Sequence, residues 1–596
     1  MIKIILFKIL KINALFKECG HRAILTFIAF FLFVACKEDT NKPKEIEGVA
    51  GNEKVAEYMK SFEGVGVLSD DSEPTPAEDA LQQFKISPDL KLDLILSEPQ
   101  INQPVEMNFD HRGRLWVVQY TQYPYPKGLK VMGMDNYLRV KYDTVPLPPP
   151  TGVQGADKIS FFEDTNGDGF YDKETNAISD LNIATSVIFG RGKIWVLNPP
   201  FLLAYLDKEG DGLPDGNPEV VLDGFGLEDT HAVANSLRWG PDGWLYGATG
   251  STVTNNINSE NSKNVFFQGQ AIWRYHPENK IFEVFAEGGG NTWHVEIDEK
   301  GRIFSGHNGV TRLMYFKQGA YYGKNWGKHG DLTNPYAFGV LDDLKMTGEQ
   351  IRFTHAEIKY EGGSLPEKYD HNLFSLNSLQ NYVQLSTVDE DGSTFRTVDT
   401  ERVLETDDQW FRPVDIKVGP DGGIFMTDWY DSRLTHVDPN DTWDKSTGRV
   451  YRIQAKNKTG VPSFDLSTYS NDQLVDLLSH KNKWFRQQAL RQIGDRKDAA
   501  LIPKLKSLMK SSDLQTSLEA FWALNLSGGF NEENAAAALS HKNQFIRSWA
   551  IRLIGDNKDA STILSNSLLQ LAKNESNVEV RSQLAATANR LPAEIS

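Results

Sequence analysis

His231 is the residue of this chain best suited to act as a general base. A histidine with a pKa near neutrality can accept the proton of an alcohol while a hydride leaves the adjacent carbon. Asp229 lies just before it and could orient the imidazole, and Asn235 follows and could hold a substrate hydroxyl. A structural histidine that is hydrogen-bonded within a sheet explains the same residues equally well. The spacing therefore defines a candidate base and leaves its role open.

A second set of polar and aromatic residues recurs in later segments at similar positions. Arg412 precedes Pro413, which holds it in an extended conformation from which its guanidinium could face an anion. Each residue of the set also has a structural explanation, such as a core indole or a turn-capping carboxylate. Because several segments place Arg, Asn or His at the same point, we expect them to converge on one site. The set comprises Asn291, His294, Asn308, Arg312, Arg412, Asp415, Trp429 and Asp431.

Two loops have the oxygen spacing of a calcium site. A hard cation takes roughly six to eight oxygen ligands, and a central glycine lets the backbone turn tightly enough to bring them together. Neither loop has the glutamate that closes an EF-hand, because Thr175 and Pro218 stand at the twelfth positions. Metal-free turns rich in Asp and Gly are an equal alternative. The predicted ligands are Asp164, Asn166, Asp168 and Asp172 in the first loop, and Asp207, Glu209, Asp211 and Asp215 in the second.

The element that must position these residues is a short β-hairpin. Leu237 and Trp239 alternate as one strand, Pro241-Asp-Gly243 forms a tight turn, and Trp244-Leu-Tyr246 opens the next strand. Similar hairpins recur along the chain, which is typical of a β-propeller. We expect six blades within residues 86–455, with functional residues near the central mouth. The proline-rich stretch 120–155 is expected to be a loop and a lid. If it contains a pair of strands, seven blades are the alternative to six.

The C-terminal part is predicted to be helical and repetitive. Ser479-His-Lys-Asn482 begins a segment that recurs from Ser540, with degenerate copies at 518–526 and near Val578. The period is about 30 residues, which suits stacked helix pairs of the HEAT type. We therefore expect an α-helical HEAT-repeat solenoid over residues 464–596, a fold that commonly docks protein partners.

The N-terminus is predicted to be a lipoprotein signal segment, residues 1–36. Basic residues precede an uncharged run that is too short to span a bilayer, and Phe33-Val-Ala-Cys36 resembles a lipobox in which Cys36 is lipidated. The following Lys37-Glu-Asp39 resembles the export signal of surface lipoproteins of Bacteroidota. An ordinary cleaved secretory signal is the alternative. We expect an outer-membrane lipid anchor with palmitate, cell-surface exposure, and a flexible tether over residues 37–85.

Cysteine count and charge exclude several classes of protein. Cys19 lies in the signal segment and Cys36 is the lipidation site, so the mature chain is expected to have no disulfide, no Cys-based zinc site and no covalent haem. The formal net charge of -17 argues against nucleic acid as a partner, and leaves the lipid anchor as the expected contact with the membrane.

The motif that runs from His231 through Gly240-Pro-Asp-Gly243 to Tyr246 resembles the glucose/sorbosone dehydrogenases that depend on pyrroloquinoline quinone (PQQ), which are six-bladed propellers. The chain is more closely similar to the "membrane-bound dehydrogenase" propeller family of PVC bacteria and Bacteroidota. There HEAT repeats follow the propeller, and often a haem-binding domain that we do not expect here. The supporting stretches are Asp164–Asp172, Phe225-Gly226, Leu237–Tyr246, Tyr322-Gly323, Trp410–Asp415 and Gly419–Asp431.

The resemblance implies a cofactor and roles for several residues. In these enzymes Arg and Lys hold the carboxylates of PQQ, a calcium ion polarises the quinone, and a histidine is the base. The resemblance makes His231 that base and Arg412 a cofactor contact, and Asn291 a contact to cofactor or substrate. Arg312 is expected to balance cofactor charge as well.

Three functions remain open from the sequence. The first is a surface lipoprotein that oxidises a sugar or polyol hydroxyl with PQQ and calcium, and passes electrons to a separate carrier that docks on the HEAT repeats. The second is a non-redox glycan-binding propeller, or a lyase or hydrolase of a glycan-utilisation system. Aromatic platforms would suit it, namely Tyr123, Tyr125, Trp293, Trp410 and Trp429. The third is a scaffold in which the helical array docks a partner.

Overall fold

The computed structural model describes residues 72–134, 139–306, 308–324, 332–353, 356–434, 441–458 and 463–595. All of them belong to one compact unit, Val49–Ser596. The predicted signal segment, Cys36 and the tether up to residue 71 lie outside the described residues. No helix within the described ranges combines the length and the apolar character needed to cross a bilayer.

Residues 72–85 belong to the folded unit, so the predicted tether is too long at its C-terminal end. The short helix α4 (Ala77–Leu81) buries Ala80, and β1 (Lys85–Ile86) pairs with a strand near residue 404. Upstream of α4, Ser72 Oγ accepts a hydrogen bond of 2.8 Å from the indole of Trp410. These contacts order the segment against the sheet region, because they satisfy buried polar groups of that region.

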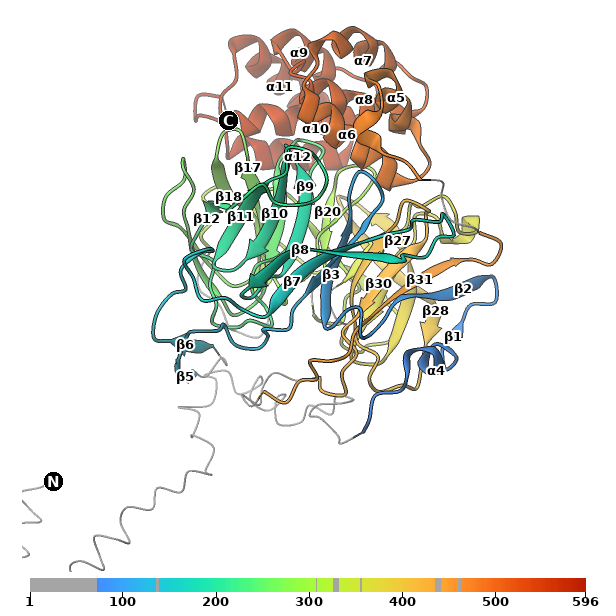
Figure 1. Cartoon of the computed structure of the whole chain (residues 1–596). Coiled ribbons are helices and arrows are strands. Elements are labelled where there is room, and N and C mark those ends of the chain that lie inside the picture. The colour runs from blue at the N-terminus through green and yellow to red at the C-terminus, as the bar shows by residue number, and fades with distance from the viewer. Residues whose placement is uncertain are drawn as a thin grey trace, which may run out of the picture. The chain divides into compact units, whose positions relative to one another are not determined.

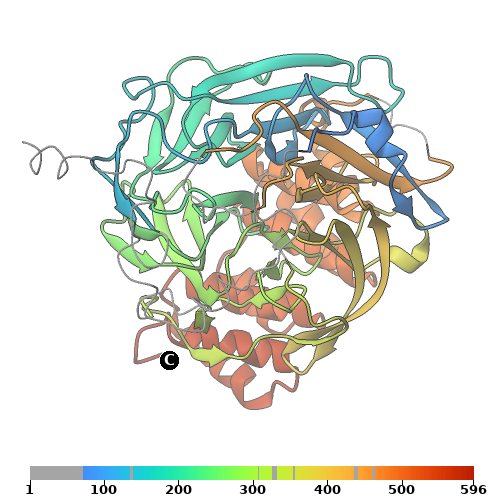
Figure 2. The ribbon, with the colours of Figure 1, turned by 90° about the horizontal axis from the view of Figure 1, so that it is seen from below.

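Most of the chain forms mainly antiparallel sheets arranged around a common axis (Figure 2). The sheets of the N-terminal half each run outward in chain order, with neighbours hydrogen-bonded. They are β3 (Pro104–Phe109), β4 (Leu115–Gln119), β7 (Asp157–Glu163) and β8 (Lys173–Leu181); β9 (Ser186–Gly190), β10 (Lys193–Asn198), β11 (Phe201–Leu206) and β12 (Glu219–Leu222); and β13 (Asn235–Trp239), β14 (Leu245–Thr249), β17 (Ala271–His276) and β18 (Ile281–Gly289), extended by β22 (Ala320–Lys324) and β23 (Gly339–Leu341).

The sheets of the C-terminal half follow the same plan. One has three strands, β19 (Glu296–Ile297), β20 (Ile303–Ser305) and β21 (Met314–Phe316). The next comprises β25 (Glu357–Lys359), β26 (Leu373–Asn377), β27 (Tyr382–Asp391) and β28 (Thr394–Glu405), with β1 and β24 (Lys345–Thr347) added to β28; the last comprises β29 (Pro413–Val418), β30 (Ile424–Asp428), β31 (Arg449–Ala455) and β2 (Leu90–Leu96). The added strands β22, β23 and β24 pair in parallel. Two strand pairs stand apart, β5 (Val131–Met134) with β6 (Val140–Tyr142) and β15 (Thr254–Ile257) with β16 (Val265–Gln268).

The first strand of each sheet lines the axis. β3 contacts β9 and β29, β9 contacts β13, and β25 contacts β19 and β29. The ring is closed by β2, which comes from the start of the chain and pairs with β31 from its end, with Leu92 opposite Ile453. Such a closure removes exposed sheet edges. The predicted β-propeller is confirmed, with five blades of four or more strands.

The recurring hairpin has the predicted turn, and the structure explains its aspartate. In β13–β14 the turn residue Gly243 has φ +83°, a conformation that favours glycine. Asp298 Oδ1 accepts backbone N–H groups of Lys300 (2.9 Å) and Arg302 (2.9 Å), and Asp110 does the same in its own turn. Asp110 and Asp298 stand three residues before the turn glycine, where Gly240 stands in the Pro-Asp-Gly hairpin. The aspartate of that hairpin, Asp242, directly precedes the glycine, and its Oδ1 accepts the N–H of Trp244 at 3.3 Å. At both positions an aspartate satisfies backbone N–H groups of the turn.

Helices follow the propeller and cover one end of it (Figure 1). They are η3 (Leu466–Thr468), α5 (Asn471–Asp476), η4 (Leu477–Ser479), α6 (Lys483–Arg496), η5 (Ala499–Leu501), α7 (Ile502–Leu508), α8 (Leu514–Leu526), α9 (Glu532–Leu539), α10 (Gln544–Asp556), α11 (Thr562–Asn574) and α12 (Val578–Ala588). The predicted helical region is thus confirmed, and the two clear sequence copies correspond to α6 and α10.

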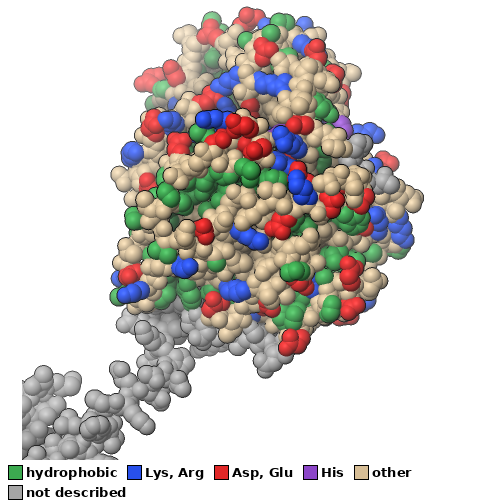
Figure 3. Space-filling view, viewed as in Figure 1, with side chains coloured by type: hydrophobic (Ala, Val, Ile, Leu, Met, Phe, Trp, Pro, Cys, Tyr) green, Lys and Arg blue, Asp and Glu red, His purple; other side chains and the backbone are tan. Residues whose placement is uncertain are grey.

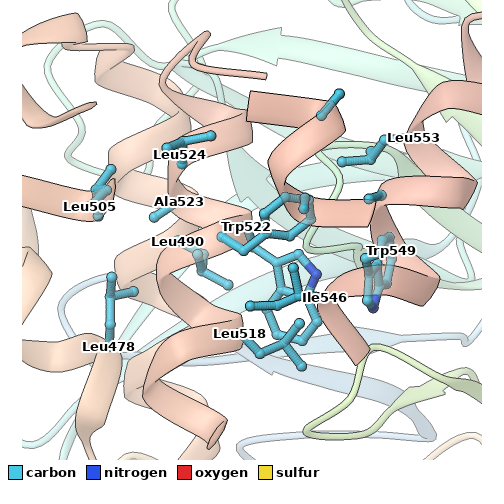
Figure 4. Close-up of a cluster of buried hydrophobic side chains, with 14 of the residues drawn as sticks. Leu478, Leu490, Leu505, Leu518, Trp522, Ala523, Leu524, Ile546, Trp549 and Leu553 are labelled. Carbon is cyan, nitrogen blue, oxygen red and sulfur yellow. The ribbon is translucent and has the colours of Figure 1, made fainter. Parts of the chain in front are cut away.

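The repeated Ser-His-Lys-Asn motif is a helix start. Asn482 and Asn543 accept the N–H groups of Trp484 (2.9 Å) and Phe545 (3.0 Å) as N-caps of α6 and α10. The preceding histidine of each copy accepts the N–H of the asparagine. The motif therefore caps the N-termini of α6 and α10. Behind it the helices share one apolar core, part of which Figure 4 shows: Leu478, Leu490, Leu505, Leu518, Trp522, Ala523, Leu524, Ile546, Trp549 and Leu553.

Candidate functional site

The predicted site residues lie at two levels of the propeller. One group is at the mouth, the end where the chain enters the first strand of each sheet. The other group lies deeper along the axis. The opposite end, which we call the floor, carries the tips of the recurring hairpins and is covered by the helices (Figure 1).

His231 is held at the mouth by three neighbouring segments. Its backbone N–H donates to Asp229 Oδ1 at 3.1 Å, and its Nδ1 lies 3.0 Å from the hydroxyl of Tyr123. The second oxygen of Asp229 accepts from Thr252 Oγ1 at 2.5 Å. Burial raises the pKa of Tyr123 well above its usual range, so this hydroxyl stays neutral beside the imidazole, and which of the two donates depends on the histidine tautomer. Asp229 thus fixes the segment that carries His231.

Asn291 is brought to the same place. Its Oδ1 accepts the backbone N–H of Ser251 at 2.7 Å, next to the segment that bonds Asp229. A Cβ at Gly250 would lie 2.4 Å from both Asn291 Oδ1 and the carbonyl oxygen of Ala232. Only glycine permits this close approach. Gly250, which follows β14, therefore brings the segment of His231 next to Asn291.

An aromatic wall stands beside His231. The rings of Tyr123 and Trp429 meet edge to face at 5.7 Å, and Tyr123 also contacts Trp443 at 5.2 Å. Both indoles are buried, and neither indole N–H has a hydrogen-bond partner among the described residues. Unused donors in a buried wall suit a ligand that brings acceptor oxygens.

Arg412 and Asp431 complete the mouth. Arg412 donates to the carbonyl oxygens of Phe411 (2.9 Å) and Ser432 (3.3 Å), and its own carbonyl accepts from the N–H of Trp429 at 2.9 Å. Asp431 accepts the N–H groups of Arg433 and Asp444, both at 2.8 Å. Burial raises the pKa of Asp431 to about 6. Arg412 thus places a guanidinium at the mouth, and two of its hydrogen bonds go to backbone carbonyls.

Asn235, His294 and Asp415 lie together below the mouth and are fully enclosed. Asn235 Oδ1 accepts the backbone N–H of His294 at 3.2 Å, and His294 Nδ1 lies 2.9 Å from Asp415 Oδ1. Lys417 donates to both oxygens of Asp415 at 2.6 Å. Burial and the charge of Lys417 lower the pKa of His294 to about 3, so the imidazole is neutral at pH 7. These three residues form an interior network below His231.

Arg312 and Asn308 already have protein partners. Arg312 Nε donates to Asp399 Oδ1 at 2.9 Å, and the guanidinium lies over the ring of Phe353 at 3.9 Å. Asn308 Oδ1 accepts from Arg352 at 2.7 Å. Asp399 balances the charge of Arg312, so this arginine has less to offer an anion than Arg412. Its cofactor role stays a prediction.

The two aspartate loops use their oxygens on the backbone. Asp164 accepts N–H groups of Gly167 (2.7 Å) and Gly169 (2.8 Å), and Asp172 accepts that of Thr165 (3.0 Å). Asn166 and Asp168 each accept the N–H two residues ahead; Asp207, Asp211 and Asp215 act in the same way in the second loop, and Glu209 lies beside them in the chain. These oxygens shape tight turns, and calcium binding stays a prediction.

Within the described residues, one group of three His or acidic side chains lies close enough to share a metal ion, and it is not one of the predicted loops. It consists of Glu299, Glu361 and His371. Lys359 and Lys483 already contact its carboxylates at 3.0 and 3.4 Å. The charge of these carboxylates is therefore balanced by lysines.

The sequence analysis missed how two residues participate in the site. Tyr123 was expected as a stacking platform, but its hydroxyl bonds the predicted base. Lys417 was not considered, although it follows Asp415 by two positions on one strand and so faces the same side. Strand alternation could have identified Lys417. The pairing of Tyr123 with His231 joins positions 108 residues apart, and no local pattern indicates it.

Similarity to solved structures is weak in identity and broad in coverage. The PQQ-bound aldose sugar dehydrogenase of Streptomyces coelicolor is 13% identical, with 62% of this chain and 100% of that chain covered and a TM-score of 0.35. The PQQ domain of pyranose dehydrogenase from Coprinopsis cinerea is 12% identical, with 62% and 97% covered and a TM-score of 0.36. Virginiamycin B lyase of Staphylococcus aureus is 11% identical, with 62% and 99% covered and a TM-score of 0.32.

None of the curated proteins matches the chain. A family model described as "Domain of unknown function (DUF7133)" matches residues 76–457, the propeller with its first helix. The match covers well over half of the sequence. The chain belongs to the DUF7133 family.

Proposed function

We propose that the mouth binds a carbohydrate or polyol and oxidises one of its hydroxyl groups with PQQ as cofactor. The observation that carries the proposal is the placement of His231. Its Nδ1 lies 3.0 Å from Tyr123, at a wall with two unused indole donors, and Arg412 stands on the segment next to Trp429. A base, donors for hydroxyl oxygens and a cation thus meet at one end of the propeller.

The chain's own residues would act as follows. In the tautomer that suits a base, Nδ1–H of His231 donates to the hydroxyl oxygen of Tyr123, and Nε2 accepts the proton of a substrate hydroxyl. Asp229 holds the backbone of His231 so that the imidazole keeps its place. The indoles of Trp429 and Trp443 donate to oxygens of the ligand, and their rings exclude water from one side.

The chain supplies some of the groups that would hold PQQ. Arg412 would meet a cofactor carboxylate, because it lies at the mouth beside Trp429. Arg312 fits less well, since Asp399 already balances its charge. When bound, PQQ would accept the hydride of the alcohol carbon, which carries both electrons, while the base takes the hydroxyl proton. We also propose calcium, because alcohol oxidation with PQQ commonly uses it as a Lewis acid.

A non-redox function is the second candidate, and a specific observation favours it. The wall of Tyr120, Tyr123, Trp429 and Trp443 with free indole donors would hold a sugar ring without any cofactor. The mouth would then serve glycan binding, or a lyase or hydrolase that uses the Tyr123–His231 pair.

The cellular setting and finer architecture are proposed on sequence and contacts. We propose an outer-membrane lipoprotein anchored through Cys36, with an electron carrier or other protein partner on the outer face of the helices. We further propose that the three-stranded sheet β19–β21 is a sixth blade, since β19 contacts β25, and that α5–α12 are HEAT-like helix pairs.

The test is a titration of protein lacking residues 1–36 with PQQ, in calcium and in chelator, followed by a sugar panel with an artificial electron acceptor. Calcium-dependent binding and sugar-driven reduction are expected, and His231→Ala should lower the rate by roughly 10²–10⁴-fold. His371→Ala is the control, because His371 lies on a turn outside the mouth. Oxidation that survives both His231→Ala and Arg412→Ala would rule out the assignment. Glycan affinity without PQQ binding would support the second candidate.

A further inference from the structure

A cavity lies between the floor of the propeller and the helices, far along the axis from the mouth. Its volume is about 130 Å³, whereas one water needs roughly 10–15 Å³. Both regions line it: Arg238 and Lys417 come from axial strands, and Trp484, Arg491 and Trp522 come from α6 and α8. The partly exposed side chains of Arg191 and Asp495 also line it and mark a rim toward solvent.

Four donors in the lining lack hydrogen-bond partners among the described residues. They are Nη2 of Arg238, Nη2 of Arg491, and the indole N–H groups of Trp484 and Trp522. All four atoms are buried, and Trp522 has an exposed fraction of 2%. One lining acceptor, Oε2 of Glu519, is likewise without a partner. Buried donors almost always have an acceptor, so the surplus points to an occupant that supplies oxygens.

Most carboxylates of the lining are already held by other cations, and Oε2 of Glu519 is an exception. Lys483 pairs with Glu296, and Arg302 bonds Asp298 at 2.8 Å. Arg486 bonds Glu519 at 2.9 Å. Other nitrogens of the two arginines are bound: Arg238 Nη1 donates to the Leu237 carbonyl at 2.9 Å, and Arg491 Nε donates to Gln488 at 3.0 Å. Their ion pairs are long, 3.6 Å from Arg238 to Glu106 and 3.8 Å from Arg491 to Asp495.

Lys417 and Arg238 carry the positive charge on the propeller side of the cavity. Lys417 donates to Asp415 at 2.6 Å, and Arg238 lies 3.6 Å from Glu106. Burial, reinforced by the charge of Arg238, lowers the pKa of Lys417. An anion near Lys417 would favour its charged form and oppose this effect.

The helical repeat shows what satisfies such an arginine elsewhere. Arg491, Trp522 and Arg552 occupy the same position of consecutive copies, and all three face the floor. Arg552 finds an acceptor in Asp242 of a hairpin turn, at 3.1 Å. Arg491 has no such carboxylate opposite it and faces the cavity instead.

We propose that this cavity binds a small oxyanion, such as inorganic phosphate or sulfate, which accepts from Arg238, Arg491, Trp484 and Trp522. The anion takes the place that Asp242 has opposite Arg552. It therefore connects the propeller to the first helices of the helical region. The inference is independent of the function proposed for the mouth.

The test measures binding of inorganic phosphate and of sulfate to the full chain by calorimetry, at constant ionic strength kept with chloride. We expect saturable binding at one site with a Kd of about 1 mM or tighter. Arg491→Gln should weaken it at least about tenfold, and Trp522→Phe, which removes one N–H and keeps the ring, several-fold. The tighter of the two anions identifies the natural ligand.

Trp549→Phe is the matched control. Its indole N–H donates to the carbonyl of Lys300 at 2.8 Å, outside the cavity lining, so affinity for the anion should not change even if stability falls. Thermal unfolding of each variant without anion establishes that it is folded. Absence of saturable binding to the wild type up to about 10 mM would mean a water-filled cavity and would overturn the proposal. Unchanged affinity in both Arg491→Gln and Trp522→Phe would overturn it as well.

Discussion

The two ends of the propeller use acidic residues in opposite ways. At the floor, Asp556 of α10 accepts from Arg274 at 2.6 Å and from Gln318 at 2.7 Å. Burial opposes ionisation of Asp556, but Arg274 and the neighbouring arginines lower its pKa. At the mouth, Asp428 and Asp431 accept mainly backbone N–H groups, and burial raises their pKa to about 7 and about 6.

This difference follows from what each end must do. The floor is an internal interface, where cations and carboxylates of propeller and helices neutralise each other. On the outer face drawn in Figure 3, charged side chains of both signs are also interspersed. The mouth leaves donors and a base for a ligand, and its carboxylates shape loops. Polar groups without protein partners therefore indicate ligand binding at the mouth and in the floor cavity, whereas paired charges do not.

The largest expected effect is at the floor. Arg274→Met should lower the free energy of unfolding by about 3–5 kcal/mol, because it leaves Asp556 and Glu283 buried without their central cation. Urea unfolding followed by tryptophan fluorescence measures it, with the helices expected to melt first. Lys345→Gln, in an exposed pair with Asp391, is the control and should change nothing measurable. If both variants were equally stable, the buried ion pairs of the floor would contribute no more to stability than an exposed pair does.

Acid should affect the two ends in opposite directions. Asp556 has a folded pKa below its unfolded value of about 3.9, so the stability it adds is present above that pH and is lost on further acidification. Asp428 and Asp431 have raised folded pKa values, so the stability they add is full below about pH 4 and is lost as pH rises through 6 to 7. Protection of mouth amides should therefore increase between pH 8 and 5.

Hydrogen exchange read by mass spectrometry distinguishes the ends in that titration. Peptides of α10 should keep constant protection from pH 8 to 5, after correction for intrinsic exchange. Asp428→Asn should remove much of the change in peptides around residues 410–431. A parallel response of both ends would contradict the assignment of the carboxylates.

Tyr123→Phe tests the mouth alone. The change removes the hydroxyl that bonds His231 and keeps the aromatic wall, so activity or glycan affinity should fall about tenfold while stability changes by no more than about 1 kcal/mol. Because Tyr123 acts through His231, the pH profile of activity should shift too. Tyr360→Phe removes a hydroxyl that bonds the Gly422 carbonyl at the floor, and should lower stability without touching activity. Loss of stability in Tyr123→Phe together with loss of activity in Tyr360→Phe would contradict the assignment of ligand binding to the mouth.

Local chemistry made the fold predictable, and long-range contacts made the site only partly so. The Pro-Asp-Gly turns and the Asn caps act within a few residues, so the propeller and the helix starts could be read directly. The closure of β2 on β31 and the bond of Tyr123 to His231 join distant segments and leave no local pattern.

The aspartate loops show a different limit. Carboxylates spaced for calcium are also spaced to accept backbone N–H groups in tight turns, and Asp164 does the latter with Gly167 and Gly169. The same residues therefore satisfy two explanations, and the sequence cannot separate them. A similar ambiguity applied to Arg312, whose partner Asp399 lies on a strand of the following sheet.

The smallest effect compares the two helix caps at the floor. Asn482 caps α6 and also donates to the carbonyls of Gly419 (2.9 Å) and Pro420 (3.2 Å) in a propeller turn, whereas Asn543 caps α10 and donates to Leu514 within the helices. Asn543→Ala should cost about 1 kcal/mol, the usual value of a cap. Asn482→Ala should cost about 1 kcal/mol more, because it leaves propeller carbonyls buried without donors. Thermal unfolding of both variants measures the difference. Equal losses would show that the turn carbonyls find other donors, and would reduce the floor interface to its ion pairs and apolar contacts.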